Sequence, residues 1–360
     1  MPGVSDIVWS ERDTTPGAIE AALRAMLKER HAENASYVPA RTLNLVCVVD
    51  REWSGEIANR LRRVGRYHAG RTIVCSVQPR RTSLDAVATI AADVAPRPGE
   101  FALLRETVVV EVGEQHLTHL ESVVDPLVVT DLPTVVWSPH GHPEAVRALL
   151  ALAQVVLLDS IDEPDPRDGL RRAAELTDDA YVVDLAWLRS TPWRERVAAT
   201  FDPPHLRAEL QTITAVTVRH EPASGAAALL LIGWLASRLE WAPGPLMTHD
   251  GGALVGSAHG RRQDVRLRLE PDPGLDVRGL AGLTLETASG RWLSLDRGPG
   301  GLHAHYRNAK GDERRWTVLG ASRGESGILG EGIRQSFLRD PTYGPALTAA
   351  NALAGASAQA

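Results

Sequence analysis

Through roughly the first 240 residues, short apolar runs alternate with longer stretches in which apolar residues recur every three or four positions. Several short runs are apolar on both faces, as in Val155–Leu158, which is typical of strands covered by helices on both sides. The strand-like runs are Thr42–Val49, Arg71–Val77, Pro133–Trp137, Gln154–Ser160, Ala180–Leu185 and Thr212–Arg219. This alternation predicts an α/β fold with a Rossmann-like, largely parallel sheet.

The stretches with helical periodicity lie before and between these runs. They are Ala18–Arg30, Glu56–Val64, Pro143–Ala153, Arg167–Leu176 and Ser224–Leu239. One insertion interrupts the alternation, because Leu84–Val94 and Phe101–Val112 are both strand-like and a Pro/Gly turn separates them at 96–99. We expect these two strands to form an antiparallel pair.

After Trp241 the pattern changes to short runs separated by Gly, Pro, Asp and Asn. Several alternate with period two, as in Val265–Glu270, which is typical of an antiparallel sheet with one solvated face. A final helix is predicted over Glu325–Arg339, followed by Asp340 and Pro341. We therefore divide the chain into an N-terminal segment (1–17), an α/β domain (18–241), a smaller antiparallel β-rich domain with a C-terminal helix (246–340) and an Ala-rich tail (348–360) that we expect to be disordered.

Composition excludes some classes of function. The chain has 360 residues, 23% of them charged, and a formal net charge of −6. A sequence-independent nucleic-acid-binding protein would carry a basic patch, so that class is not expected. The longest apolar run, Ala226–Ala236, is too short to span a bilayer, and the N-terminus has no signal-peptide pattern. We expect no membrane partner.

The only two cysteines, Cys47 and Cys75, each lie in the middle of a strand-like run. A cysteine in that position is usually a small buried apolar residue. So few cysteines fit a reducing compartment, and the expected location is the cytoplasm.

The sequence lacks the loops that bind nucleotide phosphates. Ligands of open parallel sheets bind beyond the carboxyl ends of the strands. After the first long strand, however, the chain reads DREWSG in place of G-x-G-x-x-G, and no G-x-x-x-x-G-K-[ST] occurs. We expect no dinucleotide or other cofactor. Histidines at three- or two-residue spacing, such as His116 and His119, lack the further ligands that a metal site needs, so neither a metal site nor a catalytic constellation is predicted.

Residues Asp184–Arg196 (DLAWLRSTPWRER) hold two of the nine tryptophans within seven positions, together with three arginines. Thr191 is expected as the N-cap and Pro192 as the first residue of a helix. Such a turn at the end of a strand is either a packed corner or a recognition surface. As a packed corner, its tryptophans would simply close the core.

Six segments together resemble one protein family. They are Arg41–Asp50, His68–Val77, His119–Gly141, Asp184–Arg196, Gly225–Leu239 and the C-terminal GESGILGEGIRQSFLRDPTYGPAL. Their identity and order are similar to those of the OpcA family, the glucose-6-phosphate dehydrogenase assembly proteins of cyanobacteria and actinobacteria. The resemblance covers about residues 18 to 347.

This resemblance implies a non-enzymatic protein that binds glucose-6-phosphate dehydrogenase, promotes its active oligomer and raises its activity. Protein interfaces are enriched in Trp and Arg. We therefore expect a partner-binding surface made of Trp187, Arg189, Thr191, Pro192, Trp193 and Arg194. Redox control, associated with cyanobacterial members, needs an exposed cysteine and is not expected of Cys47 or Cys75.

Two alternatives stay open. The first is an enzyme on a Rossmann-like sheet that acts on a sugar phosphate. Its phosphate would be held by Arg71, Arg80 and Arg81, and its hydroxyls by Asp50 or Asp184. The second is a metabolite-sensing subunit that binds a sugar phosphate at the carboxyl ends of the strands without converting it.

Overall fold

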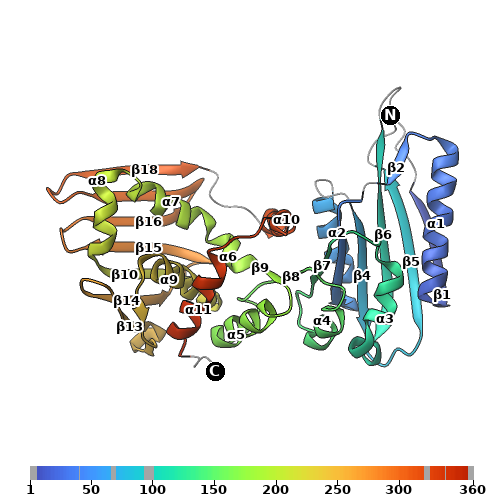
Figure 1. Ribbon diagram of the computed structural model, residues 1–360, viewed down its shortest axis with the longest axis horizontal. Coiled ribbons are helices and arrows are strands. Elements are labelled where there is room, and N and C mark those ends of the chain that lie inside the picture. The colour runs from blue at the N-terminus through green and yellow to red at the C-terminus, as the bar shows by residue number, and fades with distance from the viewer. Residues whose placement is uncertain are drawn as a thin grey trace. The chain divides into compact units, whose positions relative to one another are not determined.

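The computed structural model describes residues 6–39, 41–65, 70–92, 101–319, 325–336 and 338–355. By their contacts, the residues divide into two compact units, each with its own sheet (Figure 1). The first unit comprises Met1–Leu158, Asp179–Val183 and Leu329–Phe337. The second comprises Asp159–Asp178, Asp184–Ile328 and Leu338–Ala360.

The first sheet has the order β1-β5-β6-β4-β3-β7-β8-β9, with β2 beside β6. Its strands are β1 (Ile7–Thr14), β2 (Tyr37–Pro39), β3 (Asn44–Asp50), β4 (Arg71–Gln78), β5 (Leu84–Ala92), β6 (Ala102–Gly113), β7 (Thr134–Trp137), β8 (Val155–Leu158) and β9 (Tyr181–Asp184). The run β6-β4-β3-β7-β8 is parallel, which confirms the predicted Rossmann-like sheet. The pair β5–β6 is antiparallel, as predicted for the insertion, whereas the turn at 96–99 lies outside the described residues.

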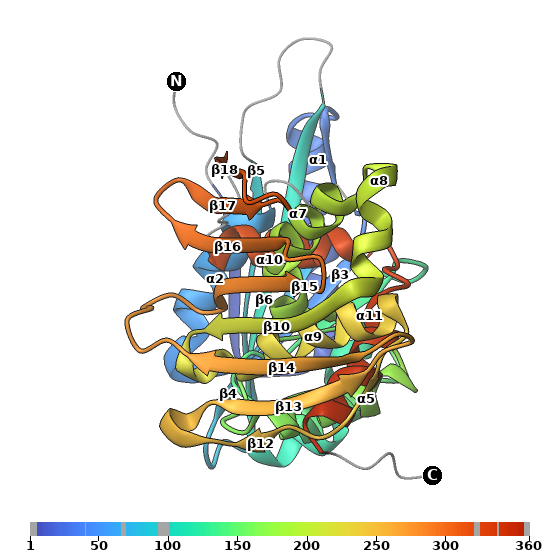
Figure 2. The same ribbon diagram turned by 90° about the vertical axis from the view of Figure 1, so that its left-hand side faces the viewer.

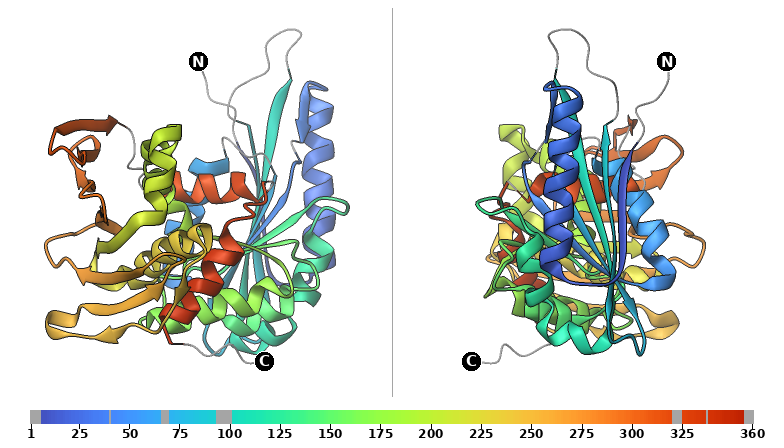
Figure 3. Two further views of the ribbon diagram at one scale, coloured as in Figure 1. Left: turned by 60° about the vertical axis from the view of Figure 1, so that its left-hand side comes forward. Right: turned by 90° about the vertical axis from the view of Figure 1, so that its right-hand side faces the viewer.

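Two helices lie on opposite faces of this sheet (Figure 3, right). They are α1 (Pro16–Glu33), against β5, and α2 (Arg51–Gly65), against β4 and β3. The Thr15 side chain accepts a hydrogen bond from the N–H of Ala18, and Pro16 begins α1, so the helix start is capped. Ile19, Leu23 and Met26 form its buried stripe. Two short helices, α3 (Glu121–Val124) and α4 (Pro143–Leu149), belong to the same unit.

The second sheet has the order β11-β13-β14-β10-β15-β16-β17-β18, with β12 beside β13. Its strands are β10 (Ile213–His220), β11 (Ala242–Pro243), β12 (Met247–Thr248), β13 (Leu254–His259), β14 (Asp264–Pro271), β15 (Leu280–Thr287), β16 (Trp292–Gly298), β17 (Gly301–Arg307) and β18 (Glu313–Leu319). Among the described residues, its strand pairings are antiparallel apart from that between β10 and β14, so the predicted antiparallel character is confirmed.

The longest helix of the second unit, α9 (Gly225–Leu239), has twelve buried residues among its 15. The other helices that begin after residue 158 are α5 (Pro166–Thr177), α6 (Leu185–Arg189), α7 (Thr191–Phe201), α8 (Pro204–Arg207), α10 (Glu325–Gln335) and α11 (Tyr343–Leu353). By length and composition alone, Pro222–Leu239 could cross a membrane, but 72% of that window is buried inside the protein. A core helix passes the same test, and α9 packs against β10, α5 and α11.

The predicted domain boundary at residue 241 lies inside the second unit. β10, which was expected in the parallel sheet, pairs with β14 and β15 instead. Its alternating pattern of half-buried and buried residues suits a sheet with one solvated face. The chain therefore enters the second sheet at β10, before the sequence changes after Trp241 to short runs separated by Gly, Pro, Asp and Asn.

Both ends of the chain are more regular than the sequence suggested. Within the segment 1–17, β1 pairs antiparallel with β5. The tail that we expected to be disordered begins inside α11, whose Leu347, Ala350 and Leu353 are buried. That expectation is therefore wrong for residues 348–353, because small alanines allow α11 to pack closely against α9. Residues 356–360 lie outside the described part of the chain.

Candidate functional site

The first sheet has a switch point between β3 and β7. From β3 the chain passes to β4 on one side, and it returns to β7 on the other side. In open parallel sheets the crevice beyond the carboxyl ends of two such strands is the usual ligand site. Here those carboxyl ends lie where β3 leads into α2 and where β7 leads into the loop before α4.

A hydrogen bond and an aromatic contact link the two loops. The imidazole Nε2 of His142 lies 3.1 Å from Oδ1 of Asp50. The rings of Trp53 and His140 have centroids 5.3 Å apart. His142 has a left-handed backbone (φ 55°) and precedes Pro143, the first residue of α4. The sequence carried no signal that these four residues pair, because the contacts join positions about 90 residues apart.

At the switch point, polar side chains of the two loops face one another. Burial lowers the pKa of His140, although the Asp50 charge opposes this, so burial favours the neutral ring. The carboxylate of Asp50, whose side chain is 42% exposed, already faces His142. A helix start beside a parallel strand could bind pyrophosphate only through closely approaching glycine backbone, and Arg51-Glu52-Trp53 occupies that position.

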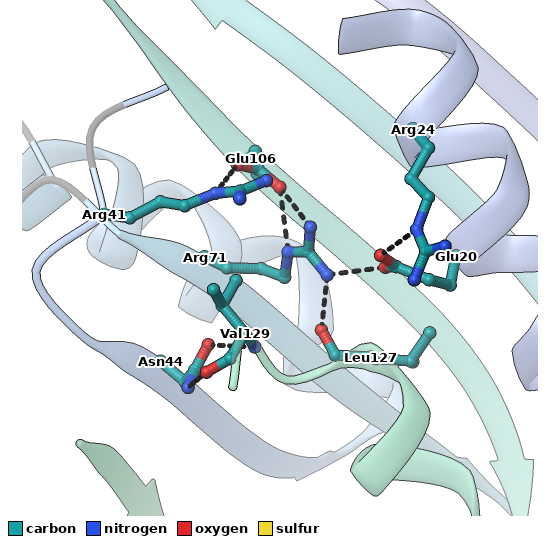
Figure 4. A network of polar contacts seen from close by, with 8 residues as sticks. All are labelled: Glu20, Arg24, Arg41, Asn44, Arg71, Glu106, Leu127 and Val129. Carbon is teal, nitrogen blue, oxygen red and sulfur yellow. Dashed lines mark hydrogen bonds and ion pairs between the residues drawn. The ribbon is translucent and has the colours of Figure 1, made fainter. Parts of the chain in front are cut away.

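Arg71 was a candidate phosphate ligand, but the structure saturates it with carboxylates (Figure 4). Its guanidinium donates to Glu106 at 2.8 Å and to Glu20 and the Leu127 carbonyl, each at 2.6 Å. Arg41 donates to the other oxygen of Glu106 at 2.9 Å. The Arg71 side chain is 2% exposed, so the network holds α1 to the sheet and leaves no room for a ligand.

Arg80 and Arg81 follow the carboxyl end of β4, the end of the strands at which the sequence predicted a ligand. Arg81 forms ion pairs with Asp85 and with Glu111, the latter at 2.9 Å. Arg80 is exposed, with a left-handed backbone (φ 62°). The three predicted phosphate ligands are thus not brought together, because Arg71 begins β4 and the other two follow its end.

Asp184, the alternative ligand for hydroxyl groups, is a buried capping residue. Its Oδ1 accepts from the N–H of Ala186 at 2.9 Å and of Ser160 at 3.1 Å. Its Oδ2 accepts from the Tyr343 hydroxyl at 3.1 Å. Burial raises the pKa of Asp184 to about 6, and the neighbouring charge of Asp159 acts in the same direction. Both carboxyl oxygens accept hydrogen bonds from within the protein, and the group does not face solvent.

The tryptophans of the Asp184–Arg196 segment are buried, and neither belongs to an exposed surface of this chain. Trp193 is 1% and Trp187 3% exposed. The Trp187 indole donates to Asp340 at 2.9 Å and meets the Tyr343 ring edge-on. These contacts correspond to the packed corner that the sequence left as the alternative.

Two arginines of the segment, Arg189 and Arg194, are buried as well, against our expectation of an exposed site, and Arg196 is half-buried. Arg189 binds the two carboxylate oxygens of Asp159 through its two terminal nitrogens, Nη1 and Nη2, at 2.9 and 2.7 Å. The Arg194 guanidinium lies 3.4 Å from the centre of the Trp187 ring, and burial lowers its pKa to about 10. Thr191, expected as a cap, is the first residue of α7 and accepts from Arg194. Pro192 is half-buried. The burial of these side chains therefore does not support a role for this segment in binding a partner.

Cys47 and Cys75 lie inside the first sheet on adjacent parallel strands. Both are fully buried, and burial raises the pKa of the Cys75 thiol to about 12. A thiol in that state is a poor nucleophile and a poor redox sensor. Within the described residues, no cluster of three His, Cys, Asp or Glu side chains could hold a metal ion.

Two family models match the chain, and both describe a subunit of glucose-6-phosphate dehydrogenase. The model for the N-terminal domain of that subunit matches residues 62–175. The model for its C-terminal domain matches residues 180–347. Together they cover most of both units.

Among curated proteins, the chain is similar to those described as OxPP cycle protein OpcA. It is 32% identical over 173 residues to the protein of Nostoc punctiforme, and this alignment covers 46% of this chain and 37% of that protein. It is 34% identical over 131 residues to the protein of Synechocystis, and this alignment covers 35% of this chain and 28% of that protein. The matches thus span less than half the length of these relatives.

Among solved structures, similar folds occur in dehydrogenases of low identity. The WlbA dehydrogenase of Thermus thermophilus is 14% identical with a TM-score of 0.45, over 87% of this chain and 94% of that one. The scyllo-inositol dehydrogenase of Lactobacillus casei is 12% identical with a TM-score of 0.45, over 89% and 97%. A likeness at this level assigns no activity to the chain.

Proposed function

Because the chain belongs to the OpcA family, as the two matching models of glucose-6-phosphate dehydrogenase subunit domains indicate, we propose that it is an assembly factor for that dehydrogenase. In this role it binds the enzyme, promotes its active oligomer and raises its activity. It thereby controls entry into the oxidative pentose phosphate pathway and performs no chemistry itself. The matching of both models, in order and over both units, is the observation that carries the proposal.

The chemistry of the first unit supports a role through contact. At the switch point His142 contacts Asp50, and the sequence there has no phosphate loop. Arg71 is fully engaged by Glu20 and Glu106. The alternative of an enzyme acting on a sugar phosphate loses its main phosphate ligand in this way.

The experiment is reconstitution of the purified full chain with glucose-6-phosphate dehydrogenase from the same organism. We expect one complex by size-exclusion chromatography with light scattering, a shift of the dehydrogenase to a larger oligomer, and a higher kcat/KM. The chain alone should not convert glucose 6-phosphate with either nicotinamide cofactor. Absence of a complex at micromolar concentration would contradict the assembly role, and turnover by the chain alone would contradict its non-enzymatic character.

A further inference from the structure

One face of the second sheet carries no helix within the described residues. Figure 2 views this face, with α9 and α11 behind the strands. Alternation along the strands distinguishes the two faces, since Leu285 and Leu293 are buried toward the helices, whereas Glu286 is exposed. The open face therefore consists of the alternate side chains, such as Glu286, that point away from the helices into solvent.

The strand register places four side chains of three kinds in one row across this face. Glu286 of β15 is opposite Trp292 of β16, Trp292 is opposite Arg307 of β17, and Arg307 is opposite Glu313 of β18. Directly paired residues of neighbouring strands lie on the same side of a sheet. The row thus runs from a carboxylate to an aromatic ring, a guanidinium and a second carboxylate.

The Trp292 ring is held in place from two sides. His305 meets it edge-on, with centroids 4.9 Å apart and planes at 89°. The Arg307 guanidinium lies 5.9 Å from the ring centre. The His305 Nε2 is in turn 2.9 Å from a carboxylate oxygen of Glu313. An aromatic ring fixed in this way, and half-buried, is a preformed flat surface.

A cavity of about 340 Å³ opens over this row. It is lined by Glu286, Thr287, Gly290, Arg291, Trp292, His305, Arg307 and Glu313. The Nε of Arg291 is buried and has no hydrogen-bond partner, although its terminal nitrogen contacts Glu209 at 3.2 Å. Arg307 forms no ion pair with any residue in the described ranges. Two guanidinium groups with unused hydrogen-bonding capacity therefore border the same cavity.

We propose that this cavity binds a phosphorylated sugar. The C–H face of the sugar lies against Trp292, Glu286 and Glu313 accept hydrogen bonds from its hydroxyls, and Arg307 with Arg291 binds the phosphate. Arginine is the residue best matched to phosphate oxygens, and an aromatic ring beside a few polar groups is typical of small-molecule sites. The volume lies within the range of such sites.

The mixture of charges selects this class over simpler ligands. An inorganic anion would use the arginines but would offer the two carboxylates no sugar hydroxyls from which to accept hydrogen bonds. An uncharged sugar would leave the arginines without an anion. The inference goes beyond the assembly role and does not rest on it, because it concerns binding by the isolated chain.

The test is isothermal titration calorimetry of the full chain with three probes: glucose 6-phosphate, glucose and inorganic phosphate. We expect glucose 6-phosphate to bind with a Kd below about 1 mM, and the other two probes at least about tenfold more weakly, since each lacks one set of charged hydrogen bonds. No heat of binding with glucose 6-phosphate up to about 10 mM, or equal affinity for inorganic phosphate, would overturn the proposal.

Two pairs of variants localise the binding. Trp292→Leu and Arg307→Gln should each weaken glucose 6-phosphate binding about tenfold or more. Their controls are Trp316→Leu and Arg314→Gln on β18, which do not line the cavity. All four should retain the circular dichroism spectrum and melting temperature of a folded chain. Binding that survives both cavity variants, or that is lost equally in the controls, would overturn the site. Complex formation with the dehydrogenase is measured separately, so a failure of either proposal is distinguishable.

Discussion

At the scale of single residues, buried charges in the second unit are structural because each has fixed partners. Asp159 is held by both nitrogens of Arg189, and Arg278 lies 3.8 Å away. Asp184 caps α6 and receives the Tyr343 hydroxyl. Removing one partner from such a group leaves an uncompensated buried charge, which costs more than the pair contributes. Substitutions here act on folding before they act on any partner.

The pH dependence of stability should reveal Asp184. Its folded pKa, about 6, exceeds that of an unfolded aspartate, about 4. The folded chain therefore binds the proton more tightly, and the free energy of unfolding falls as pH rises from about 4 to about 6. Asp184→Asn removes this contribution, so between pH 4 and pH 7 the variant should gain about 2–3 kcal/mol relative to wild type. Urea unfolding at both pH values measures it.

The exposed Asp179 supplies the control for that experiment. Asp179→Asn should leave the relative stability nearly constant over the same range, because an exposed carboxylate is solvated in both states. A relative stability of Asp184→Asn that does not change with pH would contradict the assignment.

Trp193 should behave as a core residue. Trp193→Ala removes the largest fully buried side chain and should lower the free energy of unfolding by about 3–5 kcal/mol. Trp53→Ala, at a side chain 41% exposed, should cost about 1 kcal/mol or less. Denaturant titration compares them. Similar costs for the two variants would show that burial does not distinguish these indoles. Any loss of dehydrogenase binding in Trp193→Ala would then be read together with its loss of stability.

At the scale of elements, periodicity predicted the strands and helices whose partners are close in sequence or unambiguous in pattern. β3, β4 and β7 are apolar on both faces, and the sequence assigned them to a parallel sheet correctly. It misplaced β10, because a half-buried strand has no local mark of which sheet it joins. α11 was missed because the sequence was read as an Ala-rich tail from residue 348, although Ala350 and Leu353 continue the buried face that begins with Tyr343.

The same limit applies to the site residues. Trp and Arg in one segment are enriched both in interfaces and in packed corners, and the contacts that decide between them, from Asp340 and Tyr343, come from about 150 residues away. Likewise, Glu286, Trp292, Arg307 and Glu313 are scattered over four strands, and only the register joins them in a row.

The contact of α9 with α11 depends on Gly233. A Cβ at this position would lie 2.9 Å from the backbone nitrogen of Ala350 and closer still to the carbonyl oxygen of Ala346. Gly233→Ala should therefore destabilise the chain by about 1–3 kcal/mol despite the better helix propensity of alanine. Gly17→Ala in α1, where nothing lies within 4 Å, should be neutral or stabilising by up to about 1 kcal/mol. Thermal unfolding of both variants decides; a stabilised Gly233→Ala would contradict the close packing.

At the scale of the whole molecule, each unit is assembled from segments that alternate along the chain. β10 lies between β14 and β15, in the interior of the second sheet. A fragment cut at the boundary suggested by sequence texture therefore loses an interior strand and the helix that covers it, which no local rearrangement can replace.

Expression of fragments tests this arrangement. The fragment 246–340 should be unfolded or aggregated, because the edges of β14 and β15 would be exposed without β10. The fragment 159–355 contains every strand of the second sheet and both α9 and α11, and should show a cooperative thermal transition by circular dichroism. A folded, monomeric 246–340 fragment would show that β10 is dispensable and would contradict the unit division.

The late position of α11 has a consequence for synthesis on the ribosome. The apolar helix α9 leaves the ribosome roughly a hundred residues before α11, which packs on it. At ~5–20 residues per second, the nascent chain exposes that surface for about 5–20 s. During this interval the growing polypeptide exposes an apolar helix and strands whose neighbours have not yet been synthesised. Its yield in a cell should depend on chaperones that shield nascent chains, and slower translation beyond residue 239 should increase that dependence.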